Sequence, residues 1–119
     1  MTILEEARRQ LDILDQKMTE LFETNLTAAD RSIKQSSSKQ LTDCRRQRLE
    51  IIRRIALYKK EHQLPIYNPQ RETELIERNC RLLHDQAHRP AYLVFIQTIL
   101  QESKAYQAAI FTSQDPDEQ

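Results

Sequence analysis

The sequence predicts an all-α fold, a bundle of long helices, and three observations support this. The 119 residues include no glycine and only four prolines, whereas the tight turns of a β-sheet protein usually need glycine. Apolar residues recur at steps of three and four along most of the chain, which is the period of an amphipathic helix. The length suits one modest domain, which we expect to cover residues 1–112, followed by a disordered polar tail at residues 113–119.

The apolar period divides the chain into four predicted helices. They cover approximately residues 3–34, 41–62, 69–86 and 90–111. The apolar stripe of the first helix extends through Leu26 and Ile33. Residues 35–40 include three consecutive serines, which favour a turn or a flexible joint before the second helix. Asn68 followed by Pro69 predicts the start of the third helix, because asparagine is a good N-cap and proline suits the first helical position.

Composition narrows the classes of partner and compartment. Lysine plus arginine equals aspartate plus glutamate, at 18 each, so the formal net charge is zero and argues against a nucleic-acid partner or an anionic membrane surface. No apolar run approaches the roughly 20 residues that span a bilayer, and the N-terminus lacks the basic and apolar regions of a signal peptide. Cys44 and Cys80 have no metal-site spacing and fit ordinary thiols in a reducing compartment. We therefore expect a cytoplasmic protein.

Polar side chains interrupt the apolar stripes on three of the predicted helices. They are Arg8 on the first, Arg48 and Lys59 on the second, and Ser103 and Gln107 on the fourth. Any one of them has an ordinary explanation, such as an arginine that reaches the rim of the core or a polar residue that sets helix register. Several together predict a polar cavity inside the bundle, because buried unpaired cations are costly and need an anionic partner.

The residues offer little for nucleophilic or metal chemistry. His84 and His88 are spaced as a pair that could bind a metal, but a solvated helix end is the favoured interpretation. With no glycine, the chain has no phosphate-binding glycine loop. The sequence therefore predicts a site without metal or cofactor, for an anion whose reaction needs no protein nucleophile.

Four segments of the sequence, residues 4–15, 48–59, 65–72 and 101–107, resemble the all-helical (type II) chorismate mutase family. Residues 4–15 (LEEARRQLDILD) resemble its first-helix signature, an arginine followed by Ile/Leu-Asp and a second aspartate. Residues 48–59 (RLEIIRRIALYK) resemble the second half of the same helix. Residues 65–72 (PIYNPQRE) resemble the loop and the third-helix start with its Arg-Glu pair, and residues 101–107 (QESKAYQ) resemble the fourth-helix site. The resemblance implies a long-helix bundle with two shorter helices.

The resemblance also implies an activity, the isomerisation of chorismate to prephenate in the shikimate pathway of aromatic amino-acid biosynthesis, without a cofactor. Arg8 and Arg48 would bind the substrate's two carboxylate regions. Lys59 and Gln107 would contact the ether oxygen of the breaking bond, so that Arg48, Lys59 and Gln107 would be the catalytic residues. Ser103 would lie beside a carboxylate.

The remaining implied site residues lie at the start of the third helix. Arg71 would support the site electrostatically, and Glu72 would accept a hydrogen bond from the substrate hydroxyl. Asn68 stands where many family members have an acidic residue near that hydroxyl. Asparagine can still form a hydrogen bond, although its N-cap role would also explain its presence.

Residues 25–47 depart from the family pattern, because members usually pass directly from a segment like residues 21–24 to one like residues 48–49. This insertion interrupts or extends the first long helix and allows two arrangements. In the first, an intertwined homodimer persists and Arg8 reaches into the neighbouring subunit as in family dimers; we expect this one on family grounds. Alternatively the chain folds back as a helical hairpin, and Arg8 completes the pocket of its own subunit as a monomer.

Other functions are compatible with the same residues. An isochorismate pyruvate lyase shares the fold and the cationic clamp, but Glu72 favours the mutase because it should engage the hydroxyl of the mutase substrate. A non-catalytic helical interaction module, with inward arginines that set register, predicts no binding of a dianion. A regulatory relic that binds chorismate or an aromatic amino acid without catalysis is a third alternative.

Overall fold

A computed structural model describes residues 2–113, and within this range the chain is helical without a strand, which confirms the predicted all-α class. The elements are α1 (Ile3–Thr27), α2 (Arg31–Glu61), α3 (Pro69–Cys80), the short 3₁₀ helix η1 (Gln86–His88) and α4 (Arg89–Thr112). Apart from Ser113, the tail predicted at residues 113–119 lies outside the described residues. None of the described helices has the length and apolar character needed to cross a bilayer.

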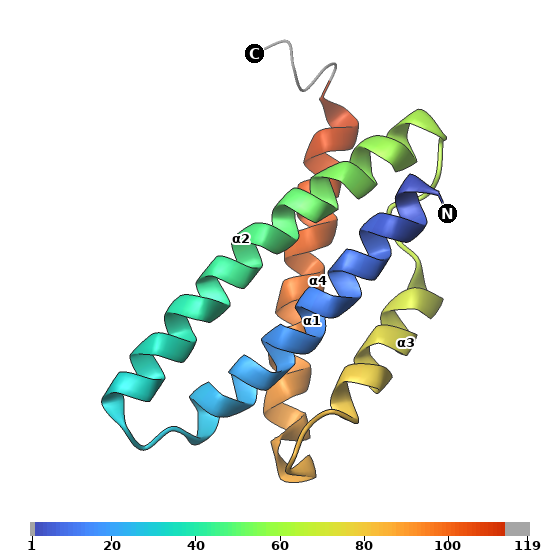
Figure 1. Ribbon diagram of the computed structural model, residues 1–119. Coiled ribbons are helices and arrows are strands. Elements are labelled where there is room, and N and C mark those ends of the chain that lie inside the picture. Colours follow the sequence, from blue (N-terminus) through green and yellow to red (C-terminus); the bar gives the residue numbers. More distant parts are fainter. Residues whose placement is uncertain (1, 114–119) are drawn as a thin grey trace.

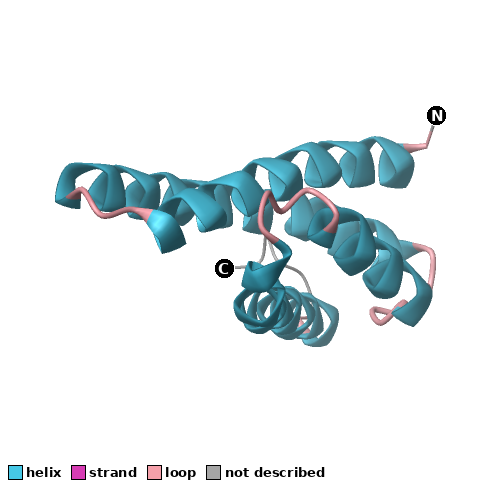
Figure 2. Ribbon diagram, turned by 90° about the horizontal axis from the view of Figure 1, so that it is seen from below, coloured by secondary structure: helices cyan, strands magenta, loops and turns pink. Residues whose placement is uncertain are grey.

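The helices form two layers. Helices α1 and α2 run antiparallel as one long hairpin, with α3 beside α1 and α4 crossing behind the hairpin (Figure 1). Seen from below, α3 and α4 lie together on one side of the hairpin, as Figure 2 shows. The hairpin therefore has one covered face, and this face contributes most of the core.

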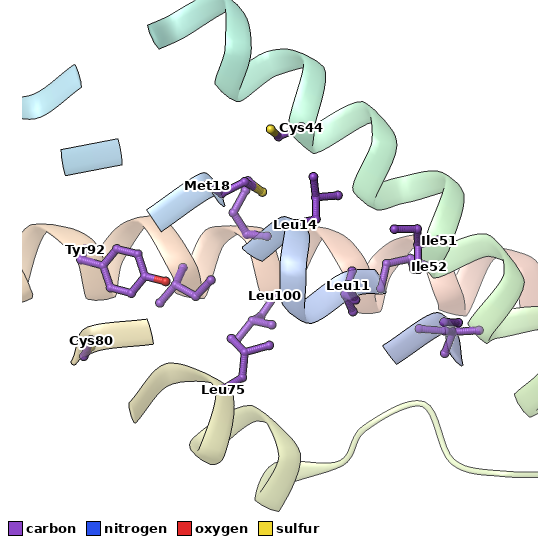
Figure 3. Close-up of a cluster of buried hydrophobic side chains, with 14 of the residues drawn as sticks. Leu11, Leu14, Met18, Cys44, Ile51, Ile52, Leu75, Cys80, Tyr92 and Leu100 are labelled. Atoms are coloured by element: carbon purple, nitrogen blue, oxygen red, sulfur yellow. The ribbon is translucent and has the colours of Figure 1, made fainter. Parts of the chain in front are cut away.

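The core lies where the covered face of the hairpin meets α3 and α4 (Figure 3). Leu11 and Met18 of α1 are almost fully buried, as are Ile52 of α2 and Ile99 of α4. Their spacing on each helix follows the apolar period found in the sequence. Burial of these stripes is the main stabilising contribution, and it holds the four helices at the distances from which polar side chains can meet.

The predicted position of the first interhelical joint is wrong. The chain reverses at residues 28–30 rather than at residues 35–40, which lie inside α2. Asp30 begins α2, because its side chain accepts a hydrogen bond from the backbone N–H of Ser32 at 2.8 Å. As a result Leu26 and Ile33, which the sequence analysis placed on a continuing buried stripe, lie near the turn and are exposed.

Tertiary contacts explain why the three serines remain helical. The Asn25 side-chain nitrogen of α1 donates to the Lys34 carbonyl at 3.0 Å, to Ser37 Oγ at 2.9 Å and to Ser38 Oγ at 2.8 Å. Serine is a poor helix former because its hydroxyl competes for backbone groups. Here two of the hydroxyls accept from a side chain across the hairpin, so the first turns of α2 are held against α1.

The third helix is shorter than predicted and ends at Cys80 instead of about residue 86. Glu23 of α1 is buried and accepts hydrogen bonds from the backbone N–H groups of His84 at 2.8 Å and Asp85 at 3.0 Å. Those two N–H groups are therefore unavailable to a continuing helix. The fourth helix begins at Arg89 and ends at Thr112, close to the predicted range.

Candidate active site

A cavity lined by charged and apolar side chains lies between α1, α2, α3 and α4. The cavity and its open mouth together enclose about 510 Å³ of empty space. All eight residues named from the sequence line it: Arg8, Arg48, Lys59, Asn68, Arg71, Glu72, Ser103 and Gln107. Its apolar walls are side chains of the core, among them Leu11, Ile52 and Leu75.

Arg48 projects from α2 into the interior and is 3 % exposed. Its Nε donates to Asp15 Oδ1 at 2.8 Å and its Nη2 donates to Asp15 Oδ2 at 3.3 Å, so α1 and α2 are joined by a bidentate ion pair. Its Nη1 donates to Ser103 Oγ of α4, whose own proton goes to the Ile99 carbonyl at 2.9 Å. The guanidinium is therefore held from two sides by groups on different helices.

Arg71 of α3 is oriented by the other acid of the first-helix signature. Its Nη2 donates to Asp12 Oδ1 at 3.2 Å, and Arg78, two turns further along α3, donates to the same oxygen at 3.0 Å. Asp12 and Asp15 are three residues apart and so lie on neighbouring positions of one helical face. The two signature carboxylates of α1 thus bind arginines from two other helices.

Lys59, at the end of α2, is 6 % exposed and donates from Nζ to the Ile66 carbonyl at 2.9 Å. Burial, reinforced by the positive charges of Arg8 and Arg71, lowers the pKa of Lys59 to about 8, against the opposing effect of Glu72. The side chain is therefore still mostly cationic at neutral pH. An ammonium has three N–H donors, so Lys59 has donors beyond the one used by Ile66.

Arg8, on the first turns of α1, is half-buried at the mouth of the cavity. Among the residues that the structure describes, it has neither a hydrogen bond nor an ion pair from its side chain. Burial and the neighbouring charge of Arg71 lower the pKa of Arg8, while Asp12 raises it. An arginine with these neighbours is available to an anion that enters the cavity.

Gln107 and Ser103 lie one turn apart on α4, and both are buried. The Oε1 atom of Gln107 has no hydrogen-bond partner within residues 2–113. Buried amide groups in proteins are usually paired, so an unpaired one in a cavity is typical of a site that a ligand completes.

The start of α3 forms one wall of the cavity. Asn68 is exposed, and its Oδ1 accepts the backbone N–H of Arg71 at 3.1 Å, which is an N-cap contact. Glu72 pairs with Lys104 of α4 at 3.3 Å. The Lys104 ammonium also lies 4.5 Å from the centre of the Tyr67 ring, so α4 holds both the loop and the first turn of α3.

The charges of the cavity do not balance. Five cations line it, and three of them are in ion pairs within residues 2–113. The pairs are Arg48 with Asp15, Arg71 with Asp12, and Lys104 with Glu72. Arg8 and Lys59 are in no ion pair with a described residue. Two positive charges are therefore unpaired, which suits a ligand with two negative charges.

The cavity is assembled within one chain. The chain folds back as the helical hairpin of the second arrangement, and this hairpin brings Arg8 of α1 beside Arg48 and Lys59 of α2. The oligomeric state is a separate question, and the homodimer stays a prediction.

Sequence reasoning missed two groups beside the cavity. Asp15 was part of the recognised signature but received no role, although an acid four residues after Leu11 on the buried stripe should pair with an inward cation such as Arg48. Lys104 lines the cavity, and only its position next to Ser103 would have suggested this. Of the two spaced histidines, His88 places its Nδ1 2.8 Å from Glu23 Oε2, and within residues 2–113 no three potential metal ligands are grouped.

The chain matches a known family over more than half of its length. The family model described as chorismate mutase type II matches residues 35–108, which include all of α3 and most of α2 and α4. Residues 4–15, the first segment on which the resemblance was based, lie outside this match, whereas part of the insertion lies inside it. No curated protein and no solved structure matches the chain. The match covers the greater part of the chain, and side chains from all four α-helices line one cationic cavity. This protein therefore belongs to the type II chorismate mutase family.

Proposed function

We propose that this protein is a chorismate mutase, which rearranges chorismate to prephenate for aromatic amino-acid biosynthesis. The observation that supports this best is the pair of cations without an ion-pair partner, Arg8 and Lys59, in a cavity whose other cations are in ion pairs. Chorismate is a dianion of matching charge. Its rearrangement is unimolecular, so it needs no nucleophile from the protein.

The two arginines would hold the two carboxylates. Arg48 has five N–H bonds, of which two bind Asp15 and one binds Ser103, so one N–H on each terminal nitrogen can bind a carboxylate side by side. Arg8 would bind the second carboxylate from the mouth of the cavity. A substrate clamped at both ends is restricted to the compact conformer in which the two reacting carbons meet.

Lys59 and Gln107 would act on the breaking bond. In the rearrangement the ether C–O bond breaks while a C–C bond forms within the same molecule, and negative charge builds on the ether oxygen in the transition state. A cation and an amide N–H held at that oxygen stabilise the transition state more than the ground state. Each such donor is typically worth about 3–4 kcal/mol of barrier. Glu72, anchored by Lys104, would accept a hydrogen bond from the ring hydroxyl.

The test is a chorismate mutase assay on the wild type, Lys59→Ala and Gln107→Ala, which follows the loss of chorismate and the formation of prephenate. We expect each substitution to lower kcat by a factor of about a hundred or more. Matched controls are Lys39→Ala and Gln101→Ala, which remove exposed residues of the same type from the same two helices. Full activity in both folded site variants would refute the assigned roles.

A second substrate separates the mutase from the lyase. Isochorismate is offered to the same wild-type preparation, and pyruvate is measured. Release of pyruvate without any prephenate from chorismate would replace the mutase by an isochorismate pyruvate lyase. Failure to bind either dianion would favour a non-catalytic helical module.

A further inference from the structure

We propose that Asp15 is a positioning residue, which orients the Arg48 guanidinium so that its two open N–H groups face a substrate carboxylate. This inference rests on the proposed mutase function. Asp15 lies on α1, outside the cavity lining, and would act on the substrate only through Arg48.

The geometry of the ion pair defines which edge of Arg48 is available. Asp15 occupies Nε and one N–H of Nη2, which together form one edge of the planar guanidinium. Ser103 takes one N–H of Nη1. One N–H of each terminal nitrogen is left for a ligand, and a contact through both requires the whole plane to be fixed. A single hydrogen bond would allow rotation about its axis, whereas the two bonds to Asp15 prevent it.

Stability alone is a poor explanation for this pair. The side chains of Asp15 and Arg48 are 1 % and 3 % exposed, and burial raises the pKa of Asp15 even though Arg48 opposes the shift. Replacing a buried ion pair by apolar residues of similar size is often neutral or stabilising. Leu14 and Met18, which lie near Asp15 on α1, belong to the apolar core.

A second ion pair provides the contrast. Arg45, one turn before Arg48 on α2, pairs with Glu102, the neighbour of Ser103 on α4, at 2.9 Å. Their side chains are 41 % and 37 % exposed, and neither residue lines the cavity. Glu102→Gln therefore removes a similar pair near the site without touching Arg48, and it is the matched control for Asp15→Asn.

The test compares steady-state kinetics of the wild type, Asp15→Asn and Glu102→Gln. Asparagine keeps the size of aspartate but offers one acceptor and an N–H₂ group that opposes the guanidinium. We expect kcat to fall by about tenfold or more in Asp15→Asn, because the carboxylate clamp is misaligned. KM should not rise, because a negative charge beside the dianion site has been removed. Glu102→Gln should keep kcat within about twofold.

A double-mutant cycle shows whether Asp15 acts through Arg48. In an Arg48→Ala background, Asp15→Asn should leave kcat unchanged, since the group it orients is gone. An equal loss of kcat in both backgrounds would overturn the proposal. So would a folded Asp15→Asn variant with wild-type kcat and a lower melting temperature, which is the result of a purely structural role. A wild type that leaves chorismate unchanged would instead overturn the proposed function.

A measurement on the wild type covers the case in which Asp15→Asn does not fold. The Arg48 Nε–H resonance is followed by NMR with and without saturating prephenate, the dianionic product. We expect slow exchange of this proton with water in both states, because Asp15 stays bonded to Nε and Nη2 of Arg48 when a ligand binds the remaining N–H groups. Rapid exchange of this proton, or its release from Asp15 on adding prephenate, would overturn the positioning role.

Discussion

The two ends of the α1–α2 hairpin bury charged side chains in opposite ways. At the turn end, near residues 28–30, Glu23 is 7 % exposed. Its carboxylate accepts hydrogen bonds from two backbone N–H groups, and its Oε2 lies 2.8 Å from His88 Nδ1. Its partners all belong to the protein. At the pocket end, where α1 begins and α2 ends, Arg8 and Lys59 have no ion-pair partner among the described residues.

This difference separates a structural charge from a functional one. A buried charge with all its hydrogen bonds made within the fold stabilises one conformation of the chain. A buried charge without an anionic partner is costly to the folded protein, and the cost is offset only when a ligand supplies the missing charge. The turn end should therefore respond to mutation through stability, and the pocket end through activity.

The largest expected effect is at the pocket end. Arg8→Ala should lower kcat/KM by about a hundredfold, because it removes a bidentate charged contact with the substrate. The free energy of unfolding should change little. Arg9→Ala removes the exposed neighbour and is the control. A large loss of thermal stability in Arg8→Ala, with kcat/KM retained, would mean that this end is as structural as the other.

Glu23→Gln should have the converse effect at the turn end. Burial raises the pKa of Glu23, but hydrogen bonds from His84, His88 and Asp85 outweigh it and lower the pKa to about 2, from an ordinary value of 4.5. We expect Glu23→Gln to lower the free energy of unfolding by about 2 kcal/mol at neutral pH and to leave kcat unchanged.

The pH dependence of that stability follows from the sign of the shift. A carboxyl whose pKa is lowered on folding stabilises the protein above its unfolded value, and this contribution is lost as the pH falls through the folded value. The difference between wild type and Glu23→Gln in urea unfolding should therefore shrink between pH 4.5 and about 2. Glu20→Gln, an exposed residue of the same helix, should show no such difference.

The pH dependence of activity sharpens the comparison at the pocket end. Because the pKa of Lys59 is lowered to about 8, the free enzyme loses this cation as the pH rises through that value. We expect kcat/KM to fall by about tenfold for each pH unit above it. A profile that is flat to pH 10 would show that the Lys59 charge is not needed.

A smaller effect is expected for the helix cap beside the pocket. Asn68→Ala removes the acceptor of the Arg71 N–H and should lower stability by about 1 kcal/mol. Asn68→Asp keeps the acceptor and should restore stability. If Asn68→Ala instead keeps full stability but loses activity, the residue contacts the substrate rather than the helix end.

The smallest effect is expected on dilution. Because Arg8 and Arg48 line one cavity within a single chain, turnover per chain should not change with protein concentration, whether or not the predicted homodimer forms. Light scattering with parallel assays measures both quantities. A mass near that of one chain, 14.2 kDa, would overturn the dimer. Activity lost on dilution would mean that a partner chain supplies Arg8.

The sequence by itself determined the all-α class and the inward positions of the polar residues. A helical period is a local property, so Arg48, Lys59, Ser103 and Gln107 could be placed on buried stripes without knowing what lay opposite them. The start of α3 was also local, since Asn68 and Pro69 cap and begin a helix through their own chemistry.

Only the tertiary structure decided where the hairpin turns, where α3 ends and which group holds Arg48. Asn25 keeps the serines of α2 helical from across the hairpin. Glu23 binds the backbone N–H groups of His84 and Asp85, just beyond the end of α3. Asp15 meets Arg48 from 33 residues away in the chain. These contacts join side chains that are distant in sequence. Local helix preferences differ by only about 1 kcal/mol per residue, so such contacts outweigh them and cannot be predicted from them.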